Sequence, residues 1–347
     1  MADTAPIRPE ERFDEERVAE YLHRVLPQLF PCTDVIFDQF PGGAANLTYR
    51  ARCPEGEEWV LRRAPLGEVA MGGHDMAREH KVLSRLWREF PLAPRAYHYC
   101  DDEEIIGKPF FVMERRRGAV VRTDWPDGWV DDSQRKRTVA ESLVDSLCDL
   151  HAVDPDAVDL GGLGRPDGFV ERQIEGWTRR WDAAMTRPVP DMEAVAGLLR
   201  ASLPGANRAA ILHNDFKLDN TMIGSDGRLV AVFDWDMATL GDPLVDLGTM
   251  LAYWAQPDDP TFLVFGENAV AIGEVMPKTE VRERYAARSG IDVSRVSFYE
   301  GLALFRIAVI IEQIYARYVA GQTTDARFAG FEPLAPRLAG AARALLS

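Results

Sequence analysis

The segment spanning residues 209–236 limits most strongly what this chain can fold into. It contains His213, Asp215 and Asn220 in the spacing H-x-D-x-x-x-x-N, directly after an apolar run. A Gly-Ser-Asp-Gly turn then leads into a second apolar run that ends at Asp234. Short apolar runs bounded by turn residues are typical of buried strands. The segment is therefore predicted to form one compact unit of strand, loop, hairpin and strand, with polar side chains at its loop ends.

Taken singly, these polar residues have ordinary structural explanations, because an Asn in a loop is usually a turn former and an Asp after a strand is usually a cap. Together they match the catalytic loop of protein kinases, in which the Asp accepts the proton of the attacking hydroxyl and the Asn helps hold magnesium. On this pattern Asp215 is the candidate base, and Asn220 and Asp234 are candidate magnesium ligands. Lys217 is placed to offset charge on the oxygens of a migrating phosphoryl group.

The same residues resemble the aminoglycoside phosphotransferase family, which also includes choline and homoserine kinases. That family has H-G-D-x-x-x-x-N followed by I-D-W-D/E, and this chain has Phe-Asp-Trp-Asp at 233–236. The run 241–247 is similar to the family's G-D-P-x-x-D-L segment, which opens the next helix. Asn214 stands where the family usually has Gly, and Asn tolerates left-handed backbone conformations better than most residues.

The resemblance implies a protein-kinase-like α+β fold with two lobes, and a length of 347 residues agrees with this because it exceeds the usual size of one domain. We expect a nucleotide-binding lobe with a leading helix in residues 1–114 and a catalytic and acceptor-binding lobe in residues 115–347. The first lobe should hold a five-stranded antiparallel sheet, and the second should be mainly helical. The expected strands are 35–40, 47–53, 58–63, 97–100 and 110–114, and the expected helices are 15–26, 74–90, 134–151, 171–185, 192–203, 298–319 and 333–346.

Two glycines, Gly42 and Gly43, lie in the turn between the first two expected strands, where a kinase-like fold covers the nucleotide phosphates. Glycines let backbone amides approach phosphates closely. A plain hairpin turn is the alternative explanation for this pair. At the other end of the lobe, the segment after the last strand should be the hinge that binds adenine, with Glu114 and Arg116 as candidate contacts. The alternative there is a set of solvated linker charges.

The third expected strand carries a basic residue at the position where a kinase has a Lys for the nucleotide phosphates. Here that residue is Arg62, and a subgroup resembling the kinase-like domain joined to certain acyl-CoA dehydrogenases also has Arg in a V-L-R-R/K pattern. Arg63 remains a competitor, since neighbouring strand residues point to opposite faces of a sheet. Glu79 on the next helix is the candidate ion-pair partner of Arg62, although a charge on an amphipathic helix is often only solvated.

Further polar residues are assigned supporting roles. His213 is expected to brace the catalytic loop, because its neighbour already serves as the base, and Asp246 is expected to be a second brace. Asp236 is a weaker candidate for contact with a second metal ion. His151 ends a helix in an L-H-x-x-D element similar to one in the family. It is open to an acid-base role, but a His at the end of a core helix is more often structural.

Composition narrows the set of partners. The formal net charge of −15 argues against nucleic-acid binding, because phosphate backbones would be repelled. Cationic partners fit this charge better, although such acidity is often only a solubility feature. The four cysteines are scattered without a C-x-x-C pair, so reduced thiols and a cytoplasmic location are expected. Charged residues interrupt the apolar segment 301–319, which favours a buried helix and no membrane partner.

The chain is therefore expected to be an enzyme that transfers the γ-phosphoryl group of ATP, with Mg²⁺, to a hydroxyl of a small molecule. The resemblance to the acyl-CoA dehydrogenase-associated group points to a hydroxy acid or its thioester as acceptor. Aminoglycosides would need a strongly acidic acceptor site, and the nearby acids Asp219 and Asp236 are explained without one. A nucleotide-binding pseudokinase and a metal-dependent phosphoesterase are the alternatives, and the second would predict more His ligands. Whether the chain forms a homodimer is left open.

Overall fold

The structure is a computed structural model that describes residues 3–41, 46–54, 56–66, 75–205, 207–257, 259, 270–323 and 325–347. Contacts divide the chain into two compact units. Unit 1 comprises Met1–Arg117, Val158–Leu160 and Val230–Ala238, and unit 2 comprises the remainder. The segment Val230–Ala238 therefore differs from the expected division, which placed it in the second lobe.

The physical reason for this difference is a set of contacts within unit 1. The backbone N–H of Val232 donates to the carbonyl of Leu92 at 2.8 Å. The indole of Trp235 is completely buried, and its ring centroid lies 6.0 Å from that of Phe90. The expected division had a single boundary, after residue 114. It therefore could not assign the later segment Val230–Ala238 to the first unit.

A five-stranded antiparallel sheet forms the centre of unit 1, as the sequence predicts, and its strand order is β1-β2-β3-β5-β4. The strands lie close to their expected positions: β1 (Ile36–Gln39), β2 (Leu47–Arg52), β3 (Glu58–Arg63), β4 (Ala96–Cys100) and β5 (Phe110–Glu114). In the register of the central pair, Leu61 faces Val112 and Arg62 faces Phe111. Alternate residues of β3 and β5 therefore belong to opposite faces of the sheet.

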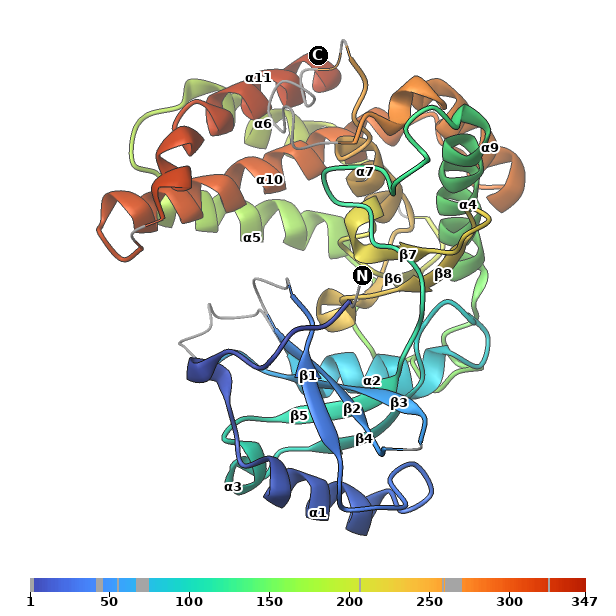
Figure 1. The fold of residues 1–347 in the computed structure, drawn as a ribbon. Coiled ribbons are helices and arrows are strands. Elements are labelled where there is room, and N and C mark those ends of the chain that lie inside the picture. The colour runs from blue at the N-terminus through green and yellow to red at the C-terminus, as the bar shows by residue number, and fades with distance from the viewer. Residues whose placement is uncertain are drawn as a thin grey trace. The chain divides into compact units, whose positions relative to one another are not determined.

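Helices cover both faces of this sheet (Figure 1). The helix α1 (Glu15–Val25) begins at Asp14, whose carboxylate accepts from the N–H of Arg17, and its apolar stripe joins the core formed with Leu61 and Val112. On the other side lies α2 (Met76–Leu86), capped in the same way by Asp75. The short α3 (Glu103–Ile106) connects β4 to β5. The α2 side of the sheet is where Arg62 and Phe111 point.

The expectation of reduced thiols is wrong for two of the four cysteines. Cys32 and Cys53 form a disulfide between the segment after α1 and the end of β2, with their Cα atoms 6.2 Å apart. Their separation of 21 residues resembles no short redox or zinc motif, so the sequence provided no signal for this pair. Cys100 and Cys148 are free thiols, and both are buried.

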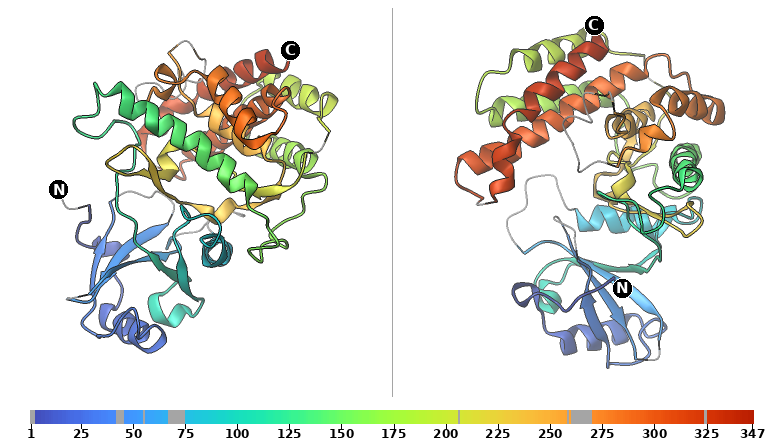
Figure 2. Two further views of the ribbon diagram at one scale, coloured as in Figure 1. Left: turned by 90° about the vertical axis from the view of Figure 1, so that its right-hand side faces the viewer. Right: turned by 45° about the horizontal axis from the view of Figure 1, so that its top comes forward.

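Unit 2 is mainly helical, and its longest helix, α10 (Val296–Val319), contacts several others (Figure 2). Its neighbours include α5, α6, α7 and α11. Arg306 and Glu312 of α10 are buried side chains with polar partners, which explains the charges that interrupt its apolar sequence. Within the described ranges, no helix is both long and apolar enough to cross a membrane. In the part of unit 2 that the structure describes, the α-helices are α4 (Ser133–Ala152), α5 (Phe169–Ala184), α6 (Pro190–Ala201), α7 (Leu244–Ala252), α9 (Lys278–Ser289), α10 and α11 (Leu334–Leu346).

Short strands support the loops of unit 2. The strand β6 (Ala210–Leu212) pairs antiparallel with β9 (Thr239–Gly241), and β7 (Thr221–Ile223) follows the catalytic-loop sequence. The strand β8 (Leu229–Val232), which belongs to unit 1 from Val230 onward, then leads to Asp234. Because β6 ends at Leu212, the polar loop predicted from the sequence begins at the next residue.

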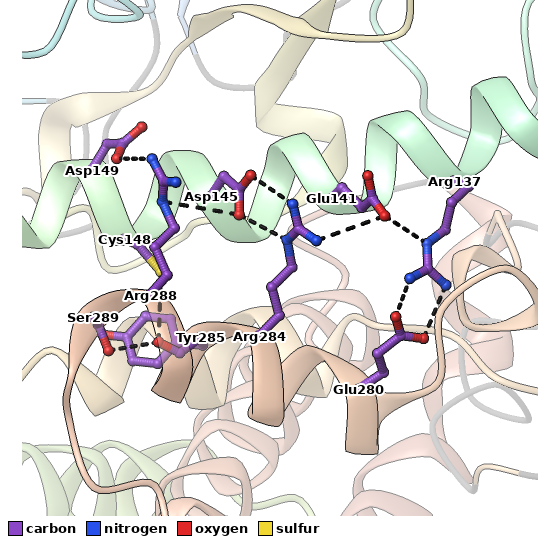
Figure 3. Close-up of polar contacts among 10 residues, drawn as sticks. All are labelled: Arg137, Glu141, Asp145, Cys148, Asp149, Glu280, Arg284, Tyr285, Arg288 and Ser289. Atoms are coloured by element: carbon purple, nitrogen blue, oxygen red, sulfur yellow. Dashed lines mark hydrogen bonds and ion pairs between the residues drawn. The ribbon is translucent and has the colours of Figure 1, made fainter.

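A ladder of alternating charges joins α4 to α9 (Figure 3). Arg284 donates to Asp145 through two nitrogen atoms at 2.8 Å each, and Arg288 donates to Asp149 at 2.6 Å. Arg137 of α4 pairs with Glu280 of α9 at the other end of the ladder. Networks of this kind hold two surface helices together more effectively than isolated surface pairs. Every arginine in this ladder has a carboxylate partner.

Candidate active site

The catalytic loop of unit 2 is held at its base by Asp246, from the first turn of α7. Its two carboxylate oxygens accept hydrogen bonds from the backbone N–H groups of His213 and Asn214, each at 2.7 Å. His213 and Asp246 are completely buried. Charge-assisted hydrogen bonds to a buried carboxylate are among the stronger ones in proteins, so Asp246 braces the turn that presents the next residue, Asp215.

The backbone of this turn is left-handed at Asn214, where φ is 67°. Asn is one of the few residues other than Gly that adopts this region readily. The carbonyl of Asn214 accepts a hydrogen bond from Arg306 of α10 at 2.9 Å. Burial lowers the pKa of Arg306 below its ordinary value, although the nearby Asp215 opposes this effect. Asp246 of α7 therefore binds the backbone N–H groups of His213 and Asn214, and Arg306 of α10 binds the Asn214 carbonyl.

The carboxylate of Asp215 has two polar partners within unit 2. Asn220 donates from its side-chain amide to Asp215 Oδ2 at 2.8 Å and to the Asp215 carbonyl at 2.9 Å. Lys217 Nζ lies 3.2 Å from Asp215 Oδ2. The Asp215 side chain keeps 26% of its surface exposed, so it remains accessible to a substrate hydroxyl. The structure therefore brings together the predicted base, the predicted cation and one predicted magnesium ligand.

Lys217 is held in its charged form. Burial disfavours its charge, but Tyr253, Asp215 and Asp219 outweigh this effect and raise the pKa of the ammonium group above its ordinary value. The ammonium lies 4.6 Å from the centre of the Tyr253 ring and 3.7 Å from Asp219 Oδ2. Burial raises the pKa of Tyr253 to about 12, so its hydroxyl stays protonated at neutral pH. A positive charge held beside Asp215 can stabilise negative charge on the oxygens of a phosphoryl group.

The two histidines near the loop have structural contacts. His213 Nδ1 accepts from the backbone N–H of Asp215 at 3.2 Å, which fits the predicted bracing role. His151 is completely buried, with Nδ1 2.7 Å from the Tyr285 hydroxyl and Nε2 3.3 Å from Asp246 Oδ2. His151 therefore contacts Asp246, the residue that holds the catalytic loop. This contact agrees with a structural role for His151.

In unit 1, Arg62 joins two acidic residues that are far apart in the sequence. Its Nε donates to Glu79 at 2.9 Å, and its terminal nitrogen donates to Asp234 at 2.5 Å. Burial disfavours the guanidinium charge, but Glu79, Asp234 and Asp236 raise the pKa of Arg62 above its ordinary value. Burial raises the pKa of Glu79 to about 7, and the Arg62 charge only partly offsets this. The predicted Arg62–Glu79 ion pair is therefore present.

Arg63 points to the opposite face of the sheet. Its guanidinium donates to the Tyr49 hydroxyl at 2.7 Å, to the Ile106 carbonyl at 3.0 Å and to the Glu11 carbonyl at 2.7 Å. The side chain is buried, and its guanidinium lies 5.4 Å from the centre of the Phe13 ring and 5.3 Å from that of Tyr49. Of the two arginines, Arg62 is the one that contacts Glu79 and Asp234, while binding of nucleotide phosphates by Arg62 stays a prediction.

The candidate hinge residues make local contacts within unit 1. Glu114 and Arg116 form an ion pair at 3.0 Å. Glu114 also accepts from the backbone N–H of Arg95 at 3.2 Å, and Arg116 donates to the Pro91 carbonyl at 2.9 Å. These contacts fit the alternative of structural linker charges, while adenine binding by this segment stays a prediction. Gly42 and Gly43 lie outside the described residues.

The two predicted magnesium ligands belong to different units, Asn220 to unit 2 and Asp234 to unit 1. The side-chain oxygen of Asn220 accepts no hydrogen bond from the part of the chain that the structure describes. Asp234 has a left-handed backbone, with φ of 69°, and lies two residues after the end of β8. Hard carbonyl and carboxylate oxygens suit Mg²⁺, which binds few protein ligands and keeps several waters. The described residues contain no cluster of three or more His, Cys, Asp or Glu suited to a metal ion.

Three residues around the loop were missed by sequence reasoning: Arg306, Tyr253 and Trp177. Arg306 binds the Asn214 carbonyl, Tyr253 lies against the Lys217 ammonium, and the Trp177 ring lies 5.5 Å from the Arg306 guanidinium. A charged residue inside an apolar helix was the available signal for Arg306, because a buried charge needs a partner. Tyr253 had no comparable signal, whereas Trp177 and Trp181 lie at i and i+4 of an expected helix, a spacing typical of packing.

The chain is similar in sequence and in fold to known proteins. Residues 37–285, most of the chain, match the model of the phosphotransferase enzyme family, APH. Acyl-CoA dehydrogenase family member 11 of Gallus gallus is 31% identical over 336 residues, covering 92% of this chain and 42% of that protein. Acyl-CoA dehydrogenase family member 10 of Mus musculus is 29% identical over 329 residues, covering 94% of this chain and 30% of that protein. The chain thus spans less than half the length of these relatives.

Two solved structures with the same fold are named as phosphotransferases. A proposed aminoglycoside phosphotransferase from Ralstonia eutropha JMP134 has 26% identity and a TM-score of 0.82, with 96% of this chain and 98% of that chain covered. A thermostable variant of the aminoglycoside phosphotransferase APH(4)-Ia, solved with AMP-PNP and hygromycin B, has 16% identity and a TM-score of 0.62, with coverage of 94% and 98%. The family implies use of ATP. The chain belongs to the phosphotransferase enzyme family and is a kinase that transfers a phosphoryl group to a hydroxyl group.

Proposed function

We propose that this kinase uses magnesium-bound ATP to phosphorylate the hydroxyl of a small hydroxy acid or its thioester. The observation that carries the transfer step is the arrangement of Asp215, Asn220 and Lys217, with contacts of 2.8 and 3.2 Å to one carboxylate oxygen. The observation that supports the acceptor class is the similarity to acyl-CoA dehydrogenase family members over more than nine-tenths of the chain.

In the proposed reaction, Asp215 accepts a hydrogen bond from the acceptor hydroxyl and takes its proton as the hydroxyl oxygen bonds to the γ-phosphorus. The bond from the γ-phosphorus to the bridging oxygen of ATP breaks, and ADP leaves with that electron pair. Asn220 orients the Asp215 carboxylate, and Lys217 offsets negative charge on the transferred group. Phosphoryl transfer depends mainly on positioning and charge neutralisation. In this proposal Asp215 and Asn220 position the acceptor hydroxyl, and Lys217 neutralises charge. Asp246 and Arg306 keep the loop backbone in place without touching the reacting atoms.

Asn220 and Asp234 would supply oxygen ligands to magnesium, whose charge would neutralise the nucleotide phosphates. Arg62 would bind the same phosphates, since a guanidinium matches phosphate geometry through two parallel hydrogen bonds. Its contacts with Glu79 and Asp234 hold the guanidinium in one orientation, which supports this role. These nucleotide and metal roles are part of the proposal.

The test is a transfer assay with purified protein, magnesium-ATP and a panel of hydroxy acids, their thioesters, other hydroxylated metabolites and aminoglycosides. Formation of a phosphorylated hydroxy acid or thioester, detected by mass spectrometry, is the expected result. Efficient transfer to aminoglycosides alone would overturn the proposed acceptor class while leaving the kinase assignment intact. ATP binding without transfer to any acceptor would favour a pseudokinase. Hydrolysis of phosphate esters without ATP would favour a phosphoesterase.

A further inference from the structure

An open groove of about 530 Å³ lies between α5 and α10 of unit 2, and its lining is strongly basic. This volume falls within the range of sites that hold small molecules, roughly 300–1,000 Å³. The lining contains three arginines and no acidic residue. Its members are Arg172, Gln173, Gly176, Arg179, Arg180, Ala183, Ala184 and Gln313.

Two of these arginines are available to a ligand. Arg179 and Arg180 are exposed, and neither forms a hydrogen bond or ion pair with another residue in the described ranges. The guanidinium of Arg180 stacks on the Trp177 ring at 4.6 Å, which limits its motion while leaving its N–H groups unused. Arg172 differs, because it donates to the backbone carbonyls of Asp167 and Arg165.

A second basic groove in the same unit provides a contrast. It is lined by Arg228, Arg284 and Arg288 but also by three acidic residues of α4. As Figure 3 shows, Arg284 and Arg288 are paired with those carboxylates, so their charge is already neutralised. The α5–α10 groove differs, because its lining contains arginines and no acidic residue on a chain with a net charge of −15.

The groove is linked to the catalytic loop through one indole ring. Trp177 lies between the groove residue Arg180, at 4.6 Å, and Arg306, at 5.5 Å. Arg306 in turn binds the carbonyl of Asn214, which directly precedes Asp215. The indole N–H of Trp177 donates to Gln173, another groove residue, at 3.1 Å. The groove residue Arg180 is therefore joined to the residue before Asp215 through Trp177 and Arg306.

We propose that the α5–α10 groove binds a doubly charged oxyanion, such as a phosphate ester or pyrophosphate group, at the end of the acceptor remote from its reacting hydroxyl. This inference rests on the proposed function, because it extends the acceptor site of that reaction. Guanidinium groups bind phosphate through paired, charge-assisted hydrogen bonds, and two such groups match a dianion. The small residues Gly176, Ala183 and Ala184 keep the groove open beside them. A polycationic acceptor would be repelled here.

The first experiment measures binding without transfer. Inorganic pyrophosphate is titrated by calorimetry into the full chain saturated with magnesium and AMP-PNP, so that the nucleotide site is occupied. The double variant Arg179→Ala/Arg180→Ala should bind pyrophosphate at least about tenfold more weakly than the wild type. The matched control is Arg228→Ala/Arg327→Ala, which removes two exposed charges elsewhere and should bind like the wild type. Equal binding by both double variants, or no binding by the wild type, would overturn the proposal.

The second experiment uses whichever acceptor the transfer assay identifies. The Arg179→Ala/Arg180→Ala variant should raise the KM for that acceptor about tenfold and change the KM for ATP little. Gly176→Leu should have a similar effect without changing charge, since a Cβ at Gly176 would already lie 3.5 Å from Arg180. Weaker pyrophosphate binding with an unchanged acceptor KM would assign the groove to a separate anion and refute its role as an acceptor subsite. Absence of transfer in the wild type would instead refute the proposed function, which the binding experiment does not require.

Discussion

Arg62 donates a hydrogen bond to Asp234 across 2.5 Å, although the two residues lie 172 positions apart in the chain. The same guanidinium pairs with Glu79, so one cation is shared between two carboxylates within unit 1. Consequently the candidate phosphate-binding residue and a candidate magnesium ligand partly neutralise each other. Residues in one ionic network do not respond independently to mutation. Each of these three positions therefore requires its own test.

Substitutions at Arg62 and Arg63 should have different consequences. Arg62→Ala should raise the KM for ATP, and Arg62→Lys should partly restore it, because Lys keeps the charge but not the paired geometry. Arg63→Ala should instead lower the free energy of unfolding by about 2–4 kcal/mol, since it removes three hydrogen bonds from the α1 side of the sheet. Steady-state kinetics and urea denaturation of all three variants provide the comparison. A larger ATP defect at Arg63 than at Arg62, in protein shown to be folded, would contradict the assignment.

Asp234→Asn should weaken magnesium-dependent ATP binding. Asn is the suitable replacement because it tolerates the left-handed backbone at this position, whereas Ala would be strained there. The change removes one anionic oxygen ligand while preserving size and hydrogen bonding to Arg62. ATP titrations over a range of magnesium concentrations should show a higher magnesium requirement in the variant, with ATP binding in the absence of magnesium as the control. An unchanged magnesium requirement would count against Asp234 as a ligand.

Asp215→Asn should leave ATP binding nearly intact and reduce transfer by about a hundredfold or more, which is the scale expected for loss of a general base. The amide can still contact Asn220 and Lys217 but cannot take the proton of the acceptor hydroxyl. Single-turnover transfer and nucleotide titration measure the two effects separately. Turnover close to that of the wild type would exclude Asp215 as the base.

Glu79 should make the stability of the folded chain depend on pH. Its pKa is raised from 4.5 to about 7 in the folded state, chiefly by burial, so the folded state binds more protons than the unfolded state between these values. Stability from this group is therefore present below about pH 4.5 and is lost as pH rises through 7, by at most about 3 kcal/mol. Glu79→Gln should remove this loss, so its stability relative to the wild type should increase from pH 5 to pH 8.

Urea denaturation of both proteins across this pH range tests the Glu79 prediction. The neighbouring His80 titrates with the opposite sign, because burial lowers its pKa to about 4. The difference between variant and wild type cancels that contribution, since both proteins contain His80. Parallel stability curves for the two proteins would show that Glu79 does not titrate in this range.

The sequence alone determined the reaction class and the main elements of the fold. The H-x-D-x-x-x-x-N loop, the strand before Asp234 and the five strands of the sheet are local patterns, in which residue spacing directly sets which groups are neighbours. Strand periodicity and turn residues identified β3 and β5 at their observed bounds. The left-handed backbone at Asn214 was also foreseeable, because few other residues tolerate it without strain.

Tertiary structure decided which groups meet across long stretches of chain. Alternation along β3 places Arg62 and Arg63 on opposite faces, but only the packing of α1 and α2 shows which face carries Glu79 and Asp234. The Cys32–Cys53 disulfide, the Arg306 contact with the catalytic loop and the unpaired arginines of the α5–α10 groove likewise depend on packing between distant elements. Sequence spacing carries no information on such contacts, because burial and charge pairing are settled only when the helices and the sheet pack together.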